Sequence, residues 1–256
     1  MGFFKKIFGT TDSDSSNQDK IRAQYKDVQY FKKEIERFDL FIADDKEDFQ
    51  IYIEKNGRLE NHHYISACNI RLKKIECIYS LGGSINELLP ILEEVLDNFF
   101  KINTESYKDN SLCLKCLSLC ILLNTNATYK DQFETFLEKW EANDVEDSFK
   151  PVAIIYSLLS MSVTDKIVER GYYPYKLLFD ITQLPKNDVE ENIKEYLDKW
   201  YDLHKEDPWY NTHLRDKGYS GYWAWEVGAV VKRMGLDDSS FKDNPYYPYD
   251  MVHWQD

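Results

Sequence analysis

The chain has 256 residues, of which 43% are hydrophobic and 30% charged, so it is long enough to bury a substantial core and too apolar to stay unfolded. Its formal net charge of −13 excludes the Lys- and Arg-rich surfaces through which proteins bind nucleic acid or anionic membranes non-specifically. Only ten Gly and seven Pro occur, which favours long helices over a turn-rich β fold.

The first segment, residues 1–19, is a predicted flexible leader, because much of it is rich in Ser, Thr and Asp and lacks apolar periodicity. Met1–Gly9 has no continuous apolar run and is therefore not a secretory signal, although a short membrane contact through its Phe and Lys residues is an alternative. Periodic apolar residues then predict an amphipathic helix over Ile21–Ile42 and a second helix that ends at Asn56.

The segment that precedes Gly57 has an alternative interpretation. Phe49–Ile53 alternates in the manner of a strand, and Asn56-Gly57 is a common hairpin turn. No convincing second strand follows it in the sequence, so we expect Gly57 to be the residue that ends a helix.

Several later segments also show helical periodicity. A stripe over Ile65–Tyr79 predicts a helix that stops at Gly82. Ser84 with Glu87 has the form of a capping box for the next helix, although Pro90 complicates where that helix starts. Further helices are predicted over Leu112–Leu123, Asp131–Trp140, Pro151–Met161 and Asp188–Leu203.

The predicted fold class is all-α. We expect a multi-helix array, with a smaller N-terminal helical subdomain over 20–105 and a C-terminal helical domain over 106–256. No segment has the roughly 20 consecutive apolar residues that a membrane-spanning helix needs, so we expect no stable membrane association.

Three of the five Cys residues lie in one apolar segment. The spacing of Cys113, Cys116 and Cys120 places them along one helical face, where Cys packs as a small hydrophobe. A metal site would need a fourth ligand at the usual CxxC…CxxC spacing, so we expect no metal and no cofactor. Free thiols in a core predict a reducing compartment, and hence a cytoplasmic protein.

The sequence carries no established catalytic motif. It lacks a P-loop, a Rossmann glycine pattern, a GxSxG elbow and an HExxH pair. His62 and His63 are adjacent, so their side chains on a helix point about 100° apart and do not converge on one ion. We expect both to lie at the surface.

Two acidic runs lie on predicted helices. Each is explained either as a solvated helix face or as a surface that holds a cationic partner. The candidate partner-binding residues in these runs are Glu134, Glu138, Glu141, Asp144, Glu195, Asp198, Asp202 and Glu206.

The segment 217–254 is rich in Gly and aromatic residues. Its glycines permit a close approach of the backbone before an apolar helix that we expect to end at Gly235. Glu226 is the charged residue in the middle of that helix, and a buried carboxylate there needs a partner such as Arg215, Arg233 or a Tyr hydroxyl. A catalytic Glu226 in an enzyme is the alternative to this structural role.

Two features follow that helix. Asp237 and Asp238 are expected to cap the next turn through Ser239 and Ser240. The run Tyr246-Tyr247-Pro248 is expected to fold onto the body of the protein as a rigid aromatic tail.

This C-terminal pattern resembles the signature of the PoNi-type immunity proteins, the bacterial partners of PoNe DNase toxins that are delivered between competing cells. Ile78–Gly82 and Ser84–Leu88 also look like the N-terminal domain of that family. Gly228 departs from the pattern, in which Ala is expected, and should loosen the helix. The residues that carry the C-terminal resemblance are Tyr219, Gly221, Tyr222, Trp223, Trp225, Glu226, Asp237, Asp238, Tyr246, Tyr247 and Pro248.

The resemblance implies an all-α protein without enzymatic activity that binds and neutralises a cognate secreted nuclease toxin in interbacterial competition, such as that driven by type VI secretion. Because a DNase presents a basic groove to DNA, we expect an acidic surface of this chain to occlude that groove without itself binding nucleic acid. The alternative is a general helical adaptor that binds a partner protein without inhibiting it.

Overall fold

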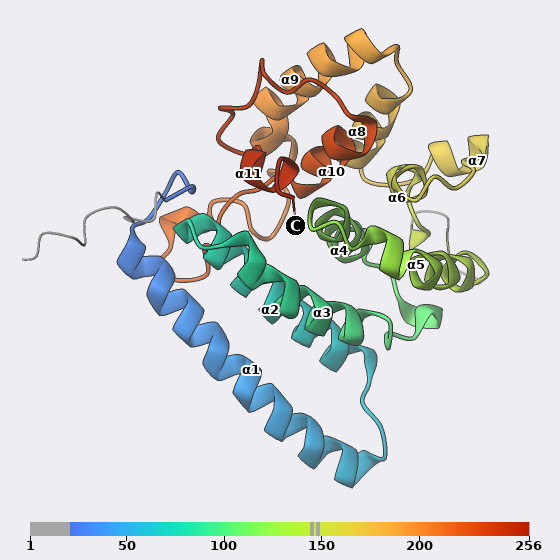
Figure 1. Cartoon of the computed structure of the whole chain (residues 1–256). Helices are drawn as coiled ribbons and strands as arrows, with labels where there is room; N and C mark the ends of the chain where they lie inside the picture. Colours follow the sequence, from blue (N-terminus) through green and yellow to red (C-terminus); the bar gives the residue numbers. More distant parts are fainter. Residues whose placement is uncertain (1–20, 144–145, 147–148, 256) are drawn as a thin grey trace, which may run out of the picture.

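The computed structural model describes residues 21–143, 146 and 149–255, and within them the chain forms eleven α-helices and no β-strand (Figure 1). The predicted all-α fold class is therefore confirmed. The predicted leader over 1–19 and Asp144 lie outside the described residues. None of the helices within this part is both long and apolar enough to cross a membrane. The helices are α1 (Val28–Asn56), α2 (Asn61–Leu81), α3 (Leu88–Phe99), α4 (Asn110–Leu122), α5 (Asn126–Glu141), α6 (Ala153–Leu158), α7 (Asp165–Val168), α8 (Tyr173–Thr182), α9 (Lys186–Leu203), α10 (Trp225–Met234) and α11 (Tyr249–Val252).

The first three helices lie side by side, with α1 packed along α2 and α2 packed along α3 (Figure 1). α1 is one continuous helix from Val28 to Asn56, so the predicted start at Ile21 and the predicted break into two helices are both wrong. The strand alternative for Phe49–Ile53 is excluded as well. Gly57 ends α1 in the left-handed conformation, as predicted.

The start of α1 is determined by an N-terminal strap, residues 21–27, that crosses the end of α2. The backbone N–H groups of Arg22 and Ala23 donate to the carbonyl oxygen of Ser80 at 3.0 and 3.2 Å. The Asp27 carboxylate then accepts a hydrogen bond from the first turn of α1. These long-range contacts hold the strap outside the helix, although its apolar residues continue the helical periodicity.

α3 begins at Leu88, directly after a 3-10 turn over Ile85–Glu87. The Ser84 side chain makes no capping hydrogen bond, so the predicted capping box does not form. Pro90 lies in the first turn of α3, where the N–H that proline lacks has no helical acceptor, and the helix continues through it.

The centre of the fold is α4, on which α3, α5, α6 and α10 pack. Between Leu112 and Leu122 every residue of this helix except Lys115 is buried, including its three Cys residues, as predicted. All five Cys residues of the chain are free and buried. Burial raises the pKa of the Cys120 thiol to about 12, which keeps it protonated and apolar in character.

The C-terminal helices gather around α10, which ends at Gly235 as predicted (Figure 1). The helix predicted over Asp188–Leu203 is present as α9, and its apolar residues Ile193, Tyr196, Leu197 and Trp200 are buried. The helix over Tyr173–Thr182, α8, was not predicted from the sequence; it begins with Pro174 in its first turn and packs on α6 and α9. The predicted division into 20–105 and 106–256 stays a prediction.

Gly228 lies where α10 crosses the C-terminal tail. A Cβ atom added at this position would lie 2.7 Å from Pro248 Cγ and 3.3 Å from both Leu122 Cδ2 and Val252 Cγ2. The glycine therefore permits close packing of α10 against α4 and α11. The expectation that Gly228 loosens the helix stays a prediction.

Candidate functional site

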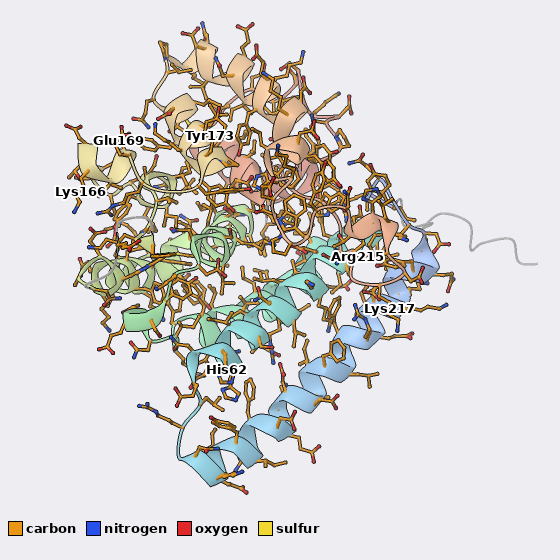
Figure 2. The ribbon with its side chains drawn as sticks, turned by 180° about the vertical axis from the view of Figure 1, so that it is seen from behind. His62, Lys166, Glu169, Tyr173, Arg215 and Lys217 are labelled. Atoms are coloured by element: carbon orange, nitrogen blue, oxygen red, sulfur yellow. The ribbon has the colours of Figure 1, made fainter. Side chains whose placement is uncertain are left out.

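A cavity of about 510 Å³ lies where α2, α4 and α9 meet the segment 218–226. Arg215, which also lines it, lies on the loop beside α1, as Figure 2 shows. Five of the lining residues belong to the C-terminal signature, and the fold places them together in the wall of this cavity. These residues are Gly221, Tyr222, Trp223, Trp225 and Glu226.

Gly221 brings this segment against the end of α2. Its φ of 116° lies in the region that favours glycine, and an added Cβ would lie 2.2 Å from Ser80 Oγ. Ser80 Oγ donates to the Ser220 carbonyl oxygen at 2.7 Å and accepts from Trp223 Nε1 at 2.9 Å. The close approach predicted from the glycines is therefore confirmed.

The residues on either side of Gly221 hydrogen-bond this segment to α1 and to the loop that contains His213. Tyr219 N donates to Tyr30 Oη at 2.9 Å, and Tyr30 Oη donates to the Tyr219 carbonyl oxygen at 3.0 Å. Tyr222 Oη accepts from the backbone N–H of His213 at 3.0 Å. The signature thus holds together helices that are far apart in the sequence.

Glu226 lies in the first turn of α10, and its carboxylate accepts a hydrogen bond from Trp200 Nε1 at 2.6 Å. This indole is its partner in place of the predicted Arg or Tyr side chains, and Arg233 donates instead to Ser160 Oγ at 2.7 Å. The side chain is 8% exposed, and burial raises the pKa of Glu226 above its ordinary value. The expectation that this carboxylate is buried and hydrogen-bonded is confirmed.

Two hydrogen-bonded pairs of titratable side chains line the cavity beside this carboxylate. Lys115 Nζ lies 2.6 Å from Glu76 Oε1, and although burial opposes the charge on Lys115, Glu76 raises its pKa. His204 Nδ1 lies 2.6 Å from Asp207 Oδ2. The Lys115–Glu76 ion pair therefore contributes little net charge to the cavity.

Neither pair was predicted as part of a site. Lys115 is the single charged residue in the apolar run Leu112–Leu123, a signal that would have marked it. His204 lies one turn beyond Trp200 on the buried side of α9, but its partner Asp207 lies after the helix ends. The two pairs meet at one cavity because of the tertiary fold, and no local sequence pattern indicates that meeting.

The two Asp residues after α10 have different roles. Asp237 Oδ1 accepts from Ser239 N at 2.9 Å and caps the turn, as predicted. Asp238 is buried and accepts from Tyr247 Oη at 2.7 Å, with His253 Nε2 at 2.8 Å, so its predicted capping role is wrong. These bonds hold the aromatic tail onto the body, and Tyr247 is buried as expected.

The adjacent histidines lie at the start of α2, where His62 is exposed, as predicted (Figure 2). His63 Nδ1 accepts a hydrogen bond from Glu60 N at 3.2 Å. In the described part of the chain, no group of three or more His, Cys, Asp or Glu side chains is arranged to hold a metal ion.

Comparison with known proteins identifies this C-terminal region. Residues 155–251 match the family model described as PoNe immunity proteins (PoNi), C-terminal. The resemblance of the C-terminal region to the PoNi proteins is therefore confirmed for these residues. A search of curated proteins found no match. The crystal structure of protein PA2201 from Pseudomonas aeruginosa aligns with a TM-score of 0.60 over 92% of this chain and 90% of that chain at 14% identity, a likeness that shows the fold alone.

The PoNi match includes α9, which carries the second acidic run. Glu195, Asp198 and Asp202 are exposed and lie on one face of this helix, because they are spaced by three and four residues. Glu195 Oε2 lies 3.5 Å from Lys199 Nζ, and because both side chains are exposed this ion pair adds little stability. Glu206 is exposed just beyond the end of α9.

The first acidic run lies on α5, outside the PoNi match, and Figure 1 shows α5 and α9 in separate parts of the molecule. Both oxygens of Glu141 accept from the buried guanidinium of Arg170 at 2.7 and 2.8 Å, and Tyr156 Oη donates to one of them at 2.9 Å. Glu134 is half-buried, and Glu138 is exposed. The fold therefore does not join the two runs into one surface.

Proposed function

We propose that this chain is an immunity protein that binds a cognate PoNe-type nuclease toxin and neutralises it by binding, without catalysis. The observation that carries this proposal is the PoNi match over residues 155–251, which contains the aromatic signature. The net charge of −13 supports it, because a nuclease must present a basic surface to the phosphates of DNA.

The outer face of α9 is the surface that best fits such a basic groove. Glu191, Glu195, Asp198 and Asp202 follow one another at intervals of four, three and four residues, and all four side chains are exposed. A row of carboxylates of this kind substitutes for the phosphates of the DNA backbone and accelerates association with a cationic partner. We propose occlusion of the groove by this face.

Co-expression with the toxin tests the proposal. We expect cells that produce the nuclease encoded by the neighbouring reading frame to survive only when this chain is also produced. With purified proteins, DNA cleavage should fall in proportion to the added chain until the two are equimolar. An equally acidic protein of unrelated fold serves as the control for charge alone.

Two results contradict the proposal. Absence of any complex between the two proteins removes the immunity function altogether. A stable complex in which the nuclease keeps its full activity would identify the chain as an adaptor instead of an inhibitor.

A further inference from the structure

The cavity between α4, α9 and α10 has aromatic walls. Trp200 and Trp209 stack in parallel with ring centroids 5.2 Å apart, and Trp223 and Tyr222 belong to the same lining. A volume of about 510 Å³ is that of a small-molecule site, and indole faces attract cations through the negative charge of their π systems.

The fixed charge that is left inside this cavity is negative. The Lys115 ammonium is held by Glu76, and the His204 imidazole by Asp207. In the part of the chain that the structure describes, no ammonium or guanidinium lies within the 4.0 Å of an ion pair from the Glu226 carboxylate. His204 and Lys115 lie close enough to favour the charged form of Glu226 and to oppose the rise in its pKa, but neither forms an ion pair with it, and a buried carboxylate is costly without such a pair.

Other charged residues of the lining do not supply that counter-ion. Lys73 and Arg215 are exposed, where solvent screens their charge. Asp109 uses one carboxylate oxygen to cap α4 by accepting from Leu112 N at 2.9 Å. Glu76 has Lys115 as its partner, and Asp207 has His204 and Tyr172 Oη. Among the described carboxylates of the lining, Glu226 is therefore the one whose side-chain donor is an indole N–H alone.

A second group in the cavity also lacks a partner. His204 is 2% exposed, and its Nε2 has no hydrogen bond among the described residues. Because Nδ1 faces the Asp207 carboxylate, which accepts a hydrogen bond, Nδ1 carries a hydrogen; in the neutral tautomer that this contact favours, Nε2 is an acceptor. Both Glu226 and His204 therefore call for a ligand that donates hydrogen bonds.

We propose that this cavity binds an organic cation, a guanidinium or primary ammonium group, with Glu226 as its counter-ion, His204 Nε2 as a second acceptor and the indoles of Trp200 and Trp209 as its walls. Such a group belongs either to a free small molecule or to an Arg or Lys side chain of a partner protein. The indole N–H of Trp225, also without a partner among the described residues, is a donor and is not accounted for by this ligand. The inference does not depend on the proposed immunity function.

Calorimetric titration of the full chain tests this proposal with three butyl probes: butylguanidinium, the smaller butylammonium, and butylurea, which is the neutral isostere of butylguanidinium. We expect saturable binding of the cations, at least about tenfold tighter than that of butylurea, because a charge-assisted hydrogen bond to Glu226 is lost in the neutral probe. Equal binding of butylurea and butylguanidinium, or no binding of either cation, overturns the proposal.

Variants locate the site. E226Q should weaken butylguanidinium binding at least about tenfold, whereas E195Q removes the same charge from the outer face of α9 and should leave binding unchanged. W209L, which removes one wall without touching a charge, should also weaken binding and keeps the site testable if E226Q unfolds. Binding that survives both E226Q and W209L contradicts the assignment.

A competition experiment separates the two sources of the cation. If saturating butylguanidinium displaces the toxin from its complex with this chain, the cavity binds a side chain of the toxin. If the toxin stays bound while butylguanidinium occupies the cavity, the cavity binds a free cation. Neutralisation of the toxin without any binding of butylguanidinium would contradict the cation site and leave the immunity function standing.

Discussion

Gly228 shows at the scale of one residue how close packing decides the effect of a substitution. Alanine favours a helix over glycine by about 1 kcal/mol, but its Cβ would approach the rigid ring of Pro248 to 2.7 Å. Overpacking costs about 1–3 kcal/mol, and a contact of 2.7 Å with a rigid ring belongs in the upper part of that range, about 2–3 kcal/mol, which outweighs the gain in propensity. We expect Gly228→Ala to lower the free energy of unfolding by about 1–2 kcal/mol in urea titrations.

The contact can be isolated by a double-mutant cycle. Pro248→Ala removes the ring atom that the new methyl group would meet, so the double variant G228A/P248A should lose less stability than the sum of the two single variants. Strict additivity would show that the effect of Gly228 has another origin.

Glu226 makes stability depend on pH in a defined direction. Burial raises the pKa of Glu226, so its contribution to stability is complete below the ordinary value of 4.5 and is lost as pH rises through the higher pKa of the folded state. E226Q keeps an acceptor for Trp200 Nε1 and carries no charge. We therefore expect E226Q to match the parent protein in acid and to be the more stable of the two above neutral pH, measured by urea unfolding across pH. A difference that is constant with pH contradicts this.

At this scale, the sequence predicted which residues are buried but not which residues meet. The Cys residues of α4 and the carboxylate of Glu226 were expected in the interior, and they are there. The partners of the buried charges were not predicted, because Glu76 reaches Lys115 from another helix and Trp200 reaches Glu226 across 26 positions. Such pairs depend on tertiary packing, which periodicity does not contain.

At the scale of the element, the acidic face of α9 can be tested by charge reversal. We expect the triple variant E195K/D198K/D202K to weaken toxin binding by about 10²-fold or more, because each reversal brings like charges together at the basic groove. Surface plasmon resonance with the purified toxin measures the change.

The matched control reverses three exposed carboxylates of α1, in the variant E36K/D44K/E47K, which has the same net charge. Figure 1 shows α1 and α9 in different parts of the molecule. This control should keep nearly the affinity of the parent protein. Equal losses in the two triple variants would assign the effect to net charge and not to the face of α9.

Elements were predictable from the sequence where local residues decide them. Gly57 and Gly82 end α1 and α2 in the left-handed conformation that their position requires, and both ends were predicted. The start of α1 was not, since the strap over 21–27 is held by Ser80, far away in the sequence. Helix ends that depend on distant partners escape an argument from periodicity.

At the scale of the whole molecule, the net charge of −13 predicts how the toxin is captured. We expect the association rate constant to fall by about tenfold or more as ionic strength rises from about 0.05 M to about 0.5 M, with a smaller change in the dissociation rate. Stopped-flow fluorescence measures both rates. An association rate that is independent of salt would remove electrostatic steering from the mechanism.

The order of synthesis gives the N-terminal strap a further significance. Arg22 Nε binds Asp250 Oδ2 at 2.6 Å across 228 positions, and the same guanidinium donates to the carbonyl oxygens of Tyr79 and Gly83 at 3.0 Å. The ribosome completes position 250 long after position 22, so a growing chain that already holds α1 to α9 cannot yet form this ion pair. A chain that stops upstream of Asp250 would lack the ion pair with Arg22, which is one of the contacts that hold the strap in front of α1.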